Sequence, residues 1–279
     1  MNQLKTLSIT FLIAFFGLGY TSTFTAKKNL KNTIENAFNF RDIGGYRTSN
    51  GKTVVFNKIY RSGDLSRLKQ ADTLAIKNLA IDQIIDLRTP YEAKYIRTVY
   101  PKEVEYLNIP LLTVDVEGNA QIKRYEQVLE GVIPIKEYML SFYNEITQAE
   151  EEALMKIFDQ LEEGKTTILI SNAGKDRMGM TIALLLYALG VEKDLIVQDY
   201  MKSSEYLDGY DDMKWTRMLG EWGAKYKEQL SDRLYALWQV DENYIKVFFN
   251  TIEIKYGSID NFLEILKVDK NQLKNAYLK

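Results

Sequence analysis

The stretch from Thr166 to Gly190 constrains the fold more than any other part of the sequence. A short apolar and β-branched run leads into the polar segment Ser171–Arg177, and a strongly apolar run leaves it. This order predicts a strand, a tight loop and a helix, which together aim backbone N–H groups and the positive end of a helix at one point. Gly174 lets the loop curl, while Lys175 and Arg177 add positive charge. The stretch therefore predicts a site for an oxyanion such as phosphate.

Composition restricts the chemistry that such a site can perform. The chain has 279 residues, 46% hydrophobic and 27% charged, with a net charge of -2. These values are typical of a globular domain and give no overall basic field for nucleic acid, so we expect no nucleic-acid partner. Cysteine and histidine are both absent. Disulfides, thiolate catalysis, Cys/His zinc sites and histidine acid–base catalysis are thereby excluded, and we expect neither a metal nor a cofactor.

The N-terminus has the pattern of a secretory signal peptide. Lys5 precedes an apolar run from Thr6 to Tyr20, and small residues follow it. This run is shorter than the about 20 apolar residues that span a bilayer, so an uncleaved anchor or a buried N-terminal helix is the less favoured interpretation. We expect residues 1–26 to be a signal peptide and residues 27–279 an exported domain, periplasmic or secreted, with no stable membrane span after signal removal. The sequence does not determine the oligomeric state.

Short hydrophobic runs separated by helical patterns predict one α/β domain, a short central sheet flanked by helices. The expected strands are 54–60, 84–87, 104–109 and 166–170. A helix capped by Ser66 should follow the first strand, and Pro90 suits the first turn of another. The remaining helices are expected at 91–97, within 114–164 around a turn at 131–134, and at 178–189, 192–202, 242–256, 259–266 and 270–278.

The loop sequence Ile170-Ser-Asn-Ala-Gly-Lys-Asp-Arg-Met-Gly179 resembles a family motif. Bacterial tyrosine and phosphoinositide phosphatases carry His-Cys-x-Ala-Gly-Lys-Asp-Arg-Thr-Gly, and only the His, Cys and Thr differ, being Ile170, Ser171 and Met178 here. Further segments resemble the family in its own order: 38–46, 59–65, 84–88, 199–207 and 244–263. The resemblance implies a protein-tyrosine-phosphatase-like fold with helical lid-type insertions in the aromatic segment 205–238. The alternative interpretation is that the aromatic side chains of this segment pack in the core.

The resemblance also assigns roles to residues. Ser171 stands at the nucleophile position, and Asp176 is the candidate general acid. The phosphate-binding set is Asn172, Ala173, Gly174, Lys175, Arg177 and Met178, and the supporting set is Arg41, Asp42, Arg61, Asp86 and Arg88. Plainer interpretations stay open: Arg177 in a salt bridge, Asp176 paired with Lys175 or Arg61, and Asp86 paired structurally with Arg88.

The residues that differ from the motif share one property. In the resembled enzymes, the side chains at these three positions serve the thiolate. The residues that serve the phosphate are the same in this chain as in the motif. A serine hydroxyl is far less acidic than a thiol and needs a general base, which leaves only a Ser–Lys arrangement with Lys175. We interpret the chain as a pseudophosphatase that binds a phosphorylated ligand or a phosphate- or sulfate-like anion. The alternatives are an impaired or altered phosphatase acting on phosphotyrosine, phosphoserine or phosphoinositide, and an exported interaction module without anion affinity.

Overall fold

The computed structural model describes residues 34–111, 123–124, 126–128, 130–207 and 237–279. Within these residues, five strands form one sheet in the order β1-β2-β5-β3-β4. The strands are β1 Arg41–Asp42, β2 Ile59–Ser62, β3 Gln83–Asp86, β4 Glu105–Asn108 and β5 Thr167–Ile170. The β1–β2 pair is antiparallel and the other pairs are parallel. This mixed α/β architecture confirms the expected central sheet flanked by helices.

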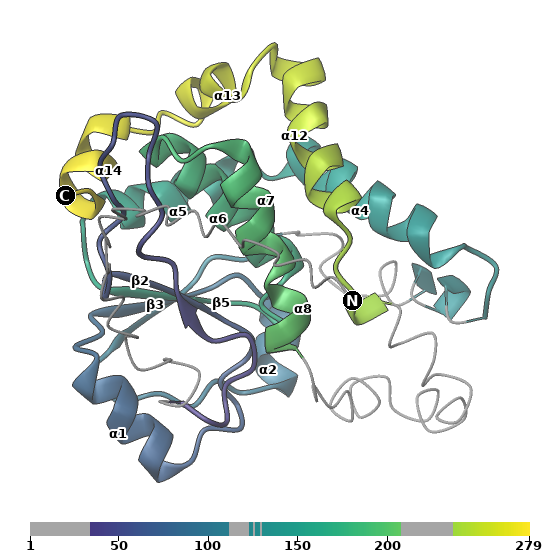
Figure 1. The fold of residues 1–279 in the computed structure, drawn as a ribbon. Helices are drawn as coiled ribbons and strands as arrows, with labels where there is room; N and C mark the ends of the chain where they lie inside the picture. Colours follow the sequence, from purple (N-terminus) through teal and green to yellow (C-terminus); the bar gives the residue numbers. More distant parts are fainter. Residues whose placement is uncertain (1–33, 112–122, 125, 129, 208–236) are drawn as a thin grey trace, which may run out of the picture.

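Helices cover the two faces of the sheet unequally (Figure 1). Leu169 and its register neighbour Ile85 point to a large core made with most of the helices, while Ile168 and Ile170 point to a smaller core beside α1. The described helices are α1 Gln70–Asn78, α2 Pro90–Tyr95, α4 Ile135–Ala149, α5 Glu151–Glu162, α6 Asp176–Leu189, α7 Lys193–Met201, α8 Ser203–Tyr206, α12 Glu242–Tyr256, α13 Ile259–Ile265 and α14 Lys270–Tyr277.

The apolar helix α6 lies at the centre of the larger core. Its residues from Met178 to Leu186 are buried, so the helix is apolar on nearly all sides. A helix that is hydrophobic all round can only be stable when other elements surround it. Gly190, at φ 90, ends the helix in the left-handed conformation that glycine adopts readily.

Two sequence-based boundaries are wrong. The run 54–60 is not one strand, because Asn57 adopts φ 62 and the ladder begins only at Ile59. Ser66 does not cap α1, since its hydroxyl donates to the Asp64 carboxylate. The helix begins at Gln70 instead, where Asp72 accepts the Lys69 N–H at 2.8 Å. By contrast, Gly257 and Ser258 end α12 and begin α13 as their capping patterns predict.

The parallel register brings the carboxyl ends of four strands to one edge. Ser62, Ile170, Asp86 and Asn108 lie side by side across β2, β5, β3 and β4. Residues that follow these strands therefore meet at this edge, which is where open α/β sheets usually bind ligands. Residues 208–236 of the aromatic segment 205–238 lie outside the described residues, as do the expected signal peptide and the stretch 112–122.

Candidate functional site

The loop between β5 and α6 packs its backbone against the end of β2. The Ser171 N–H donates to the Ser62 carbonyl at 3.3 Å, and the Asp64 N–H donates to the Asn172 carbonyl at 2.9 Å. Gly174 adopts φ +68, and a Cβ built on it would lie 2.6 Å from the backbone of Ser62 and Gly63. Only glycine combines that backbone conformation with so close an approach. The predicted role of Gly174 in letting the loop curl thus has a geometric basis here.

The carbonyl groups of the loop turn toward β1 and β2. Asn39 donates from its side-chain amide to the carbonyls of Ala173 at 3.1 Å and Gly174 at 2.7 Å, and Arg61 donates to Gly174 at 2.7 Å. Since the N–H of a trans peptide points opposite to its C=O, the Gly174 and Lys175 N–H groups face the other side of the loop. There the Gly174 N–H reaches the Ser171 Oγ at 3.1 Å. That side combines peptide N–H groups with the N-terminus of α6, which favours an anion.

Ser171 lies on this side of the loop and is only 3% exposed. Among the described residues, its hydroxyl oxygen has one hydrogen-bond partner, the Gly174 N–H. No described carboxylate or amine lies in hydrogen-bond contact with it to act as a general base. A serine without a base is a poor nucleophile at neutral pH.

Arg177 extends from the first turn of α6 and is held by Glu92 of α2. Its guanidinium donates to both carboxylate oxygens of Glu92, at 2.7 and 2.8 Å, and to the Leu87 carbonyl at 3.3 Å. Burial by itself raises the pKa of Glu92, but the charge and hydrogen bonds of Arg177 outweigh it, so the pKa is lowered. The carboxylate therefore fixes the guanidinium in one orientation. Such a two-bonded pairing needs the planar guanidinium of arginine and cannot be formed by the ammonium of lysine.

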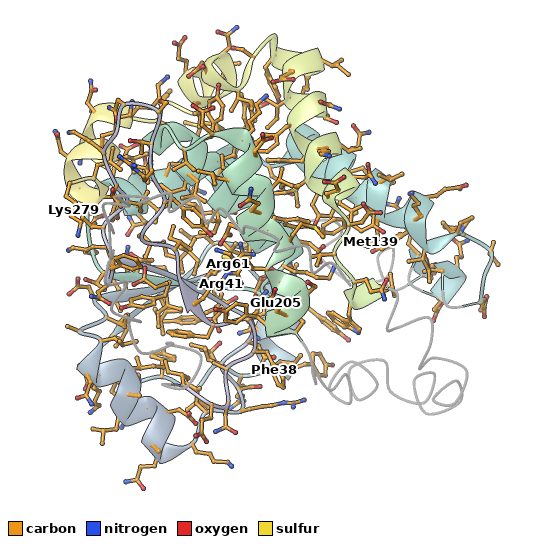
Figure 2. The ribbon with its side chains drawn as sticks, in the orientation of Figure 1. Phe38, Arg41, Arg61, Met139, Glu205 and Lys279 are labelled. Atoms are coloured by element: carbon orange, nitrogen blue, oxygen red, sulfur yellow. The ribbon has the colours of Figure 1, made fainter. Side chains whose placement is uncertain are left out.

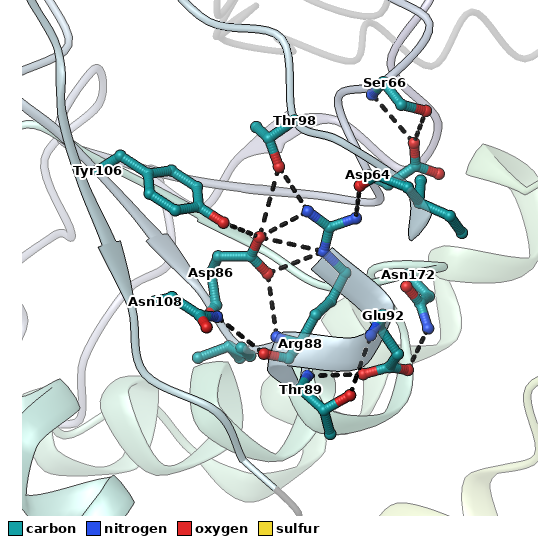
Figure 3. Close-up of polar contacts among 12 residues, drawn as sticks. Asp64, Ser66, Asp86, Arg88, Thr89, Glu92, Thr98, Tyr106, Asn108 and Asn172 are labelled. Carbon is teal, nitrogen blue, oxygen red and sulfur yellow. Dashed lines mark hydrogen bonds and ion pairs between the residues drawn. The ribbon is translucent and has the colours of Figure 1, made fainter. Parts of the chain in front are cut away.

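Sequence reasoning missed Glu92, although a signal for it exists. Thr89 and Glu92 form a capping box at the start of α2, with the Thr89 N–H donating to Glu92 at 2.7 Å and the Glu92 N–H donating to the Thr89 hydroxyl at 3.2 Å. The Thr-Pro-Tyr-Glu sequence is typical of such a box. The same carboxylate also accepts from the Asn172 side chain, as Figure 3 shows, so one residue serves the helix cap and the loop.

Asp176 is engaged by two donors at one oxygen. The Lys175 ammonium and the Tyr143 hydroxyl of α4 each lie 2.7 Å from its Oδ1. Tyr143 is fully buried, and its hydroxyl contacts that of Tyr200 at 2.6 Å. Burial, followed by the charge of Asp176 and the contact with Tyr200, raises the pKa of Tyr143 well above its usual value, so it stays protonated and donates. Of the two pairings considered for Asp176, the structure has Lys175 and not Arg61.

Arg41 and Arg61 form a cationic pair behind the loop around Asp199 of α7 (Figure 2). Arg61 donates to Asp199 at 2.7 Å, and Arg41 contacts the same carboxylate at 3.4 Å. Burial and the neighbouring Arg41 lower the pKa of Arg61 to about 10, so it remains charged at neutral pH. Asp199 and Asn39, both absent from the predicted site, thus connect α7 and β1 to the loop. Both residues lie in the segments 38–46 and 199–207 that resemble the family, which is the signal that could have revealed this role.

The remaining predicted residues make contacts with residues outside the 171–177 loop. Asp86 and Arg88 pair with each other at 2.6 Å, and Tyr106 donates to Asp86 at 2.6 Å (Figure 3). Asp42 accepts the Gly44 and Asn57 N–H groups at 2.6 Å, which fixes the Gly-Gly turn. The Met178 side chain is buried in the larger core.

Nearly the whole chain, and not only this loop, is similar to known proteins. The tyrosine phosphatase family matches residues 32–279, nearly all of the chain beyond its N-terminal segment. The chain belongs to the tyrosine phosphatase family. A protein from Cupriavidus necator named as a candidate tyrosine-protein phosphatase is 29% identical over 249 residues, covering 88% of this chain and 86% of that protein. The triple specificity protein phosphatase PtpB of Mycobacterium tuberculosis is 26% identical over 283 residues, covering 88% and 98% respectively.

Among solved structures, the TpbA protein of P. aeruginosa aligns with a TM-score of 0.28 and 15% identity, over 60% of this chain and 89% of that one.

The present chain, although it belongs to the tyrosine phosphatase family, contains no cysteine. Across the described ranges, no cluster of acidic side chains is arranged to hold a metal ion. None of the helices described here combines the length and apolarity needed to cross a membrane.

Proposed function

We propose that this protein is a pseudophosphatase, which binds a phosphate monoester or a phosphate-like anion at the 171–177 loop without hydrolysing it. In this proposal Ser171 stands where the family places its nucleophilic cysteine. The observation that carries the proposal is the pairing of a complete anion cradle with an unactivated hydroxyl. The Gly174 N–H lies on the Ser171 side of the loop, and Arg177, held by Glu92, extends from the first turn of α6, yet the Ser171 hydroxyl has no base among the described residues.

The arrangement of Asp176 disfavours the alternative of an active phosphatase. Its Oδ1 accepts hydrogen bonds from Lys175 and Tyr143 at 2.7 Å each, so this oxygen is occupied by contacts within the protein. Lys175 contacts Asp176, and no hydrogen bond joins it to the Ser171 hydroxyl among the described residues, as a Ser–Lys pair requires. Hydrolysis of p-nitrophenyl phosphate by the wild type should therefore equal that of Ser171→Ala. A clear excess of wild-type turnover would refute the pseudophosphatase proposal.

Calorimetric titration with inorganic phosphate and with vanadate tests the binding half of the proposal. Arg177→Lys keeps a cation beside Glu92, so the buried carboxylate is not left without a partner, but it removes the two-pronged donor. We expect wild-type binding and a loss of about tenfold or more in the variant, since a charge-assisted hydrogen bond contributes roughly 1.5–3 kcal/mol.

Arg124→Lys is the matched control, because Arg124 makes a similar fork with Glu145, at 2.7 and 2.9 Å, outside the loop. This variant should bind both anions as the wild type does. Absence of binding by the wild type, or equal binding by Arg177→Lys, would show that the loop is no longer an anion site. The chain would then fit a role as an interaction module.

We also propose that the protein is exported after cleavage of residues 1–26. The apolar N-terminal run supports this, and the family match begins only at residue 32, which leaves that run outside the phosphatase domain. Expression in a bacterial host, followed by fractionation and N-terminal sequencing, tests it. A full-length chain retained in the cytoplasm would contradict export.

A further inference from the structure

The proposed function assigns no role to the buried side chain of Asn39. It is 1% exposed and lies just before β1, where its backbone adopts φ 54. Residues other than glycine rarely adopt this left-handed conformation, although asparagine tolerates it better than most. Its N–H donates to the Tyr206 carbonyl of α8 at 3.2 Å, so the unusual backbone is anchored from outside the strand.

The amide orientation of Asn39 is fixed by its partners. At one end the Oδ1 accepts from the Arg41 guanidinium, which can only donate. At the other end the Nδ2 meets the carbonyls of Ala173 and Gly174, which can only accept. Arg41 is itself held by Asp199. The donating end of the amide is therefore locked onto the loop.

The two loop carbonyls depend on Asn39 to different degrees. Gly174 also accepts from Arg61 at 2.7 Å. The Ala173 carbonyl accepts a side-chain hydrogen bond only from Asn39 among the described residues. The peptide that joins Ala173 to Gly174 carries the N–H that points at Ser171 Oγ. Among the described residues, Asn39 is thus the side chain that holds this peptide from its carbonyl side.

We propose that Asn39 is a positioning residue for the anion site. It holds the peptides on either side of Gly174 with their carbonyls outward and their N–H groups inward before any ligand arrives. Donors that are already oriented need no reorganisation when charge appears, which is why preorganised N–H groups bind anions strongly. A rotated peptide would instead present a carbonyl oxygen to the anion. The proposal rests on the proposed function, because it concerns the affinity of that same loop.

Asn39→Gly tests the proposal cleanly, since glycine accepts the φ 54 backbone while losing both donations to the loop. Asn57→Gly is the matched control. Asn57 has φ 62, lies on the surface, and accepts from Tyr60 rather than contacting the loop. Asn39→Asp is a second variant, which keeps an acceptor for Arg41 and removes the donors.

We expect Asn39→Gly and Asn39→Asp to bind inorganic phosphate roughly tenfold more weakly than the wild type, in line with the loss of about one net hydrogen bond. Asn57→Gly should match the wild type. Thermal melts distinguish this from a structural role, because a merely less stable protein binds with unchanged affinity while it remains folded. Equal phosphate affinity in folded Asn39 variants would overturn the proposal.

A crystal structure of Asn39→Gly gives a readout independent of binding. We expect the Ala173–Gly174 peptide to have rotated or to occupy more than one orientation. An unchanged peptide would overturn the inference even if phosphate bound. If the wild type fails to bind phosphate, the proposed anion-binding function is refuted, and the orientation of this peptide still decides the role of Asn39.

Discussion

Replacing Gly174 by alanine should destabilise the protein more than replacing Gly51 by alanine does. Gly174 has φ +68, and a Cβ there would lie 2.6 Å from the carbonyl of Ser62 and from the N of Gly63. Real Cβ atoms do not approach backbone so closely, so either the loop or the end of β2 must move. Gly51 has a similar φ of +84 but nothing within 4 Å of its Cβ position.

The two positions separate the conformational cost from the steric cost. A left-handed L-residue costs about 1–2 kcal/mol, and this applies to both variants. Forcing additional volume into a packed region costs about 1–3 kcal/mol more, and this applies only to Gly174. We therefore expect Gly174→Ala to lose about 2–5 kcal/mol of unfolding free energy and Gly51→Ala about 1–2 kcal/mol.

Urea titration followed by circular dichroism, with both variants and the wild type in the same buffer, measures this difference. The midpoint of Gly174→Ala should lie clearly below that of Gly51→Ala. Because the contact between the loop and the end of β2 must change to accept the methyl group, Gly174→Ala should also lose phosphate binding, whereas Gly51→Ala should retain it. Equal midpoints and equal binding would refute the contact between the loop and β2 as a determinant of the site.

Three further predictions follow from the site. Ser171→Cys should gain measurable hydrolysis of p-nitrophenyl phosphate, because the Gly174 N–H and the α6 N-terminus stabilise a thiolate. Activity no higher than that of the wild type would argue that the 171–177 loop cannot support catalysis. Burial raises the pKa of Asp199, but its guanidinium partners lower it overall, so its contribution to stability is present above the unfolded pKa of about 4 and fades as the pH falls below it. Asp199→Asn should therefore unfold more easily at pH 7, and its deficit should shrink in melts toward pH 2. Tyr143→Phe should cost about 1–3 kcal/mol in urea titrations, since Tyr200 and Asp176 lose a buried hydroxyl partner; an unchanged midpoint would mean that the hydroxyl contributes nothing net.

The strand–loop–helix at the centre of the fold was predictable because its determinants are local. The β5 run, the glycine in the loop and the apolar α6 follow one another within 25 residues, and each is set by a strong preference of backbone or solvent. Gly257 and Ser258 were predictable for the same reason, as the cap residues act on their own helix ends. The β2 boundary was missed because the alternation of residues 54–60 does not reveal the left-handed turn at Asn57.

The predicted site was incomplete for a different reason. The sequence supplied Lys175, Asp176 and Arg177, but not which partners would orient them. Glu92 reaches Arg177 only because β3 and β5 lie in register and deliver α2 to the same sheet edge. Asn39 reaches the loop carbonyls across 134 and 135 residues of chain.

By itself the sequence determined the chemistry that is ruled out and the local frame of the site. A chain without cysteine or histidine has no thiolate or imidazole in any fold, and a glycine-containing loop before an apolar helix exposes N–H groups wherever it lies. Tertiary structure alone decided the direction of those N–H groups and the partners of the charged side chains Arg61 and Arg177. Peptide orientation and the ion pairs of Arg177 and Arg61 depend on side chains distant in sequence, and hydrogen bonds act only between atoms that the fold brings within about 3 Å.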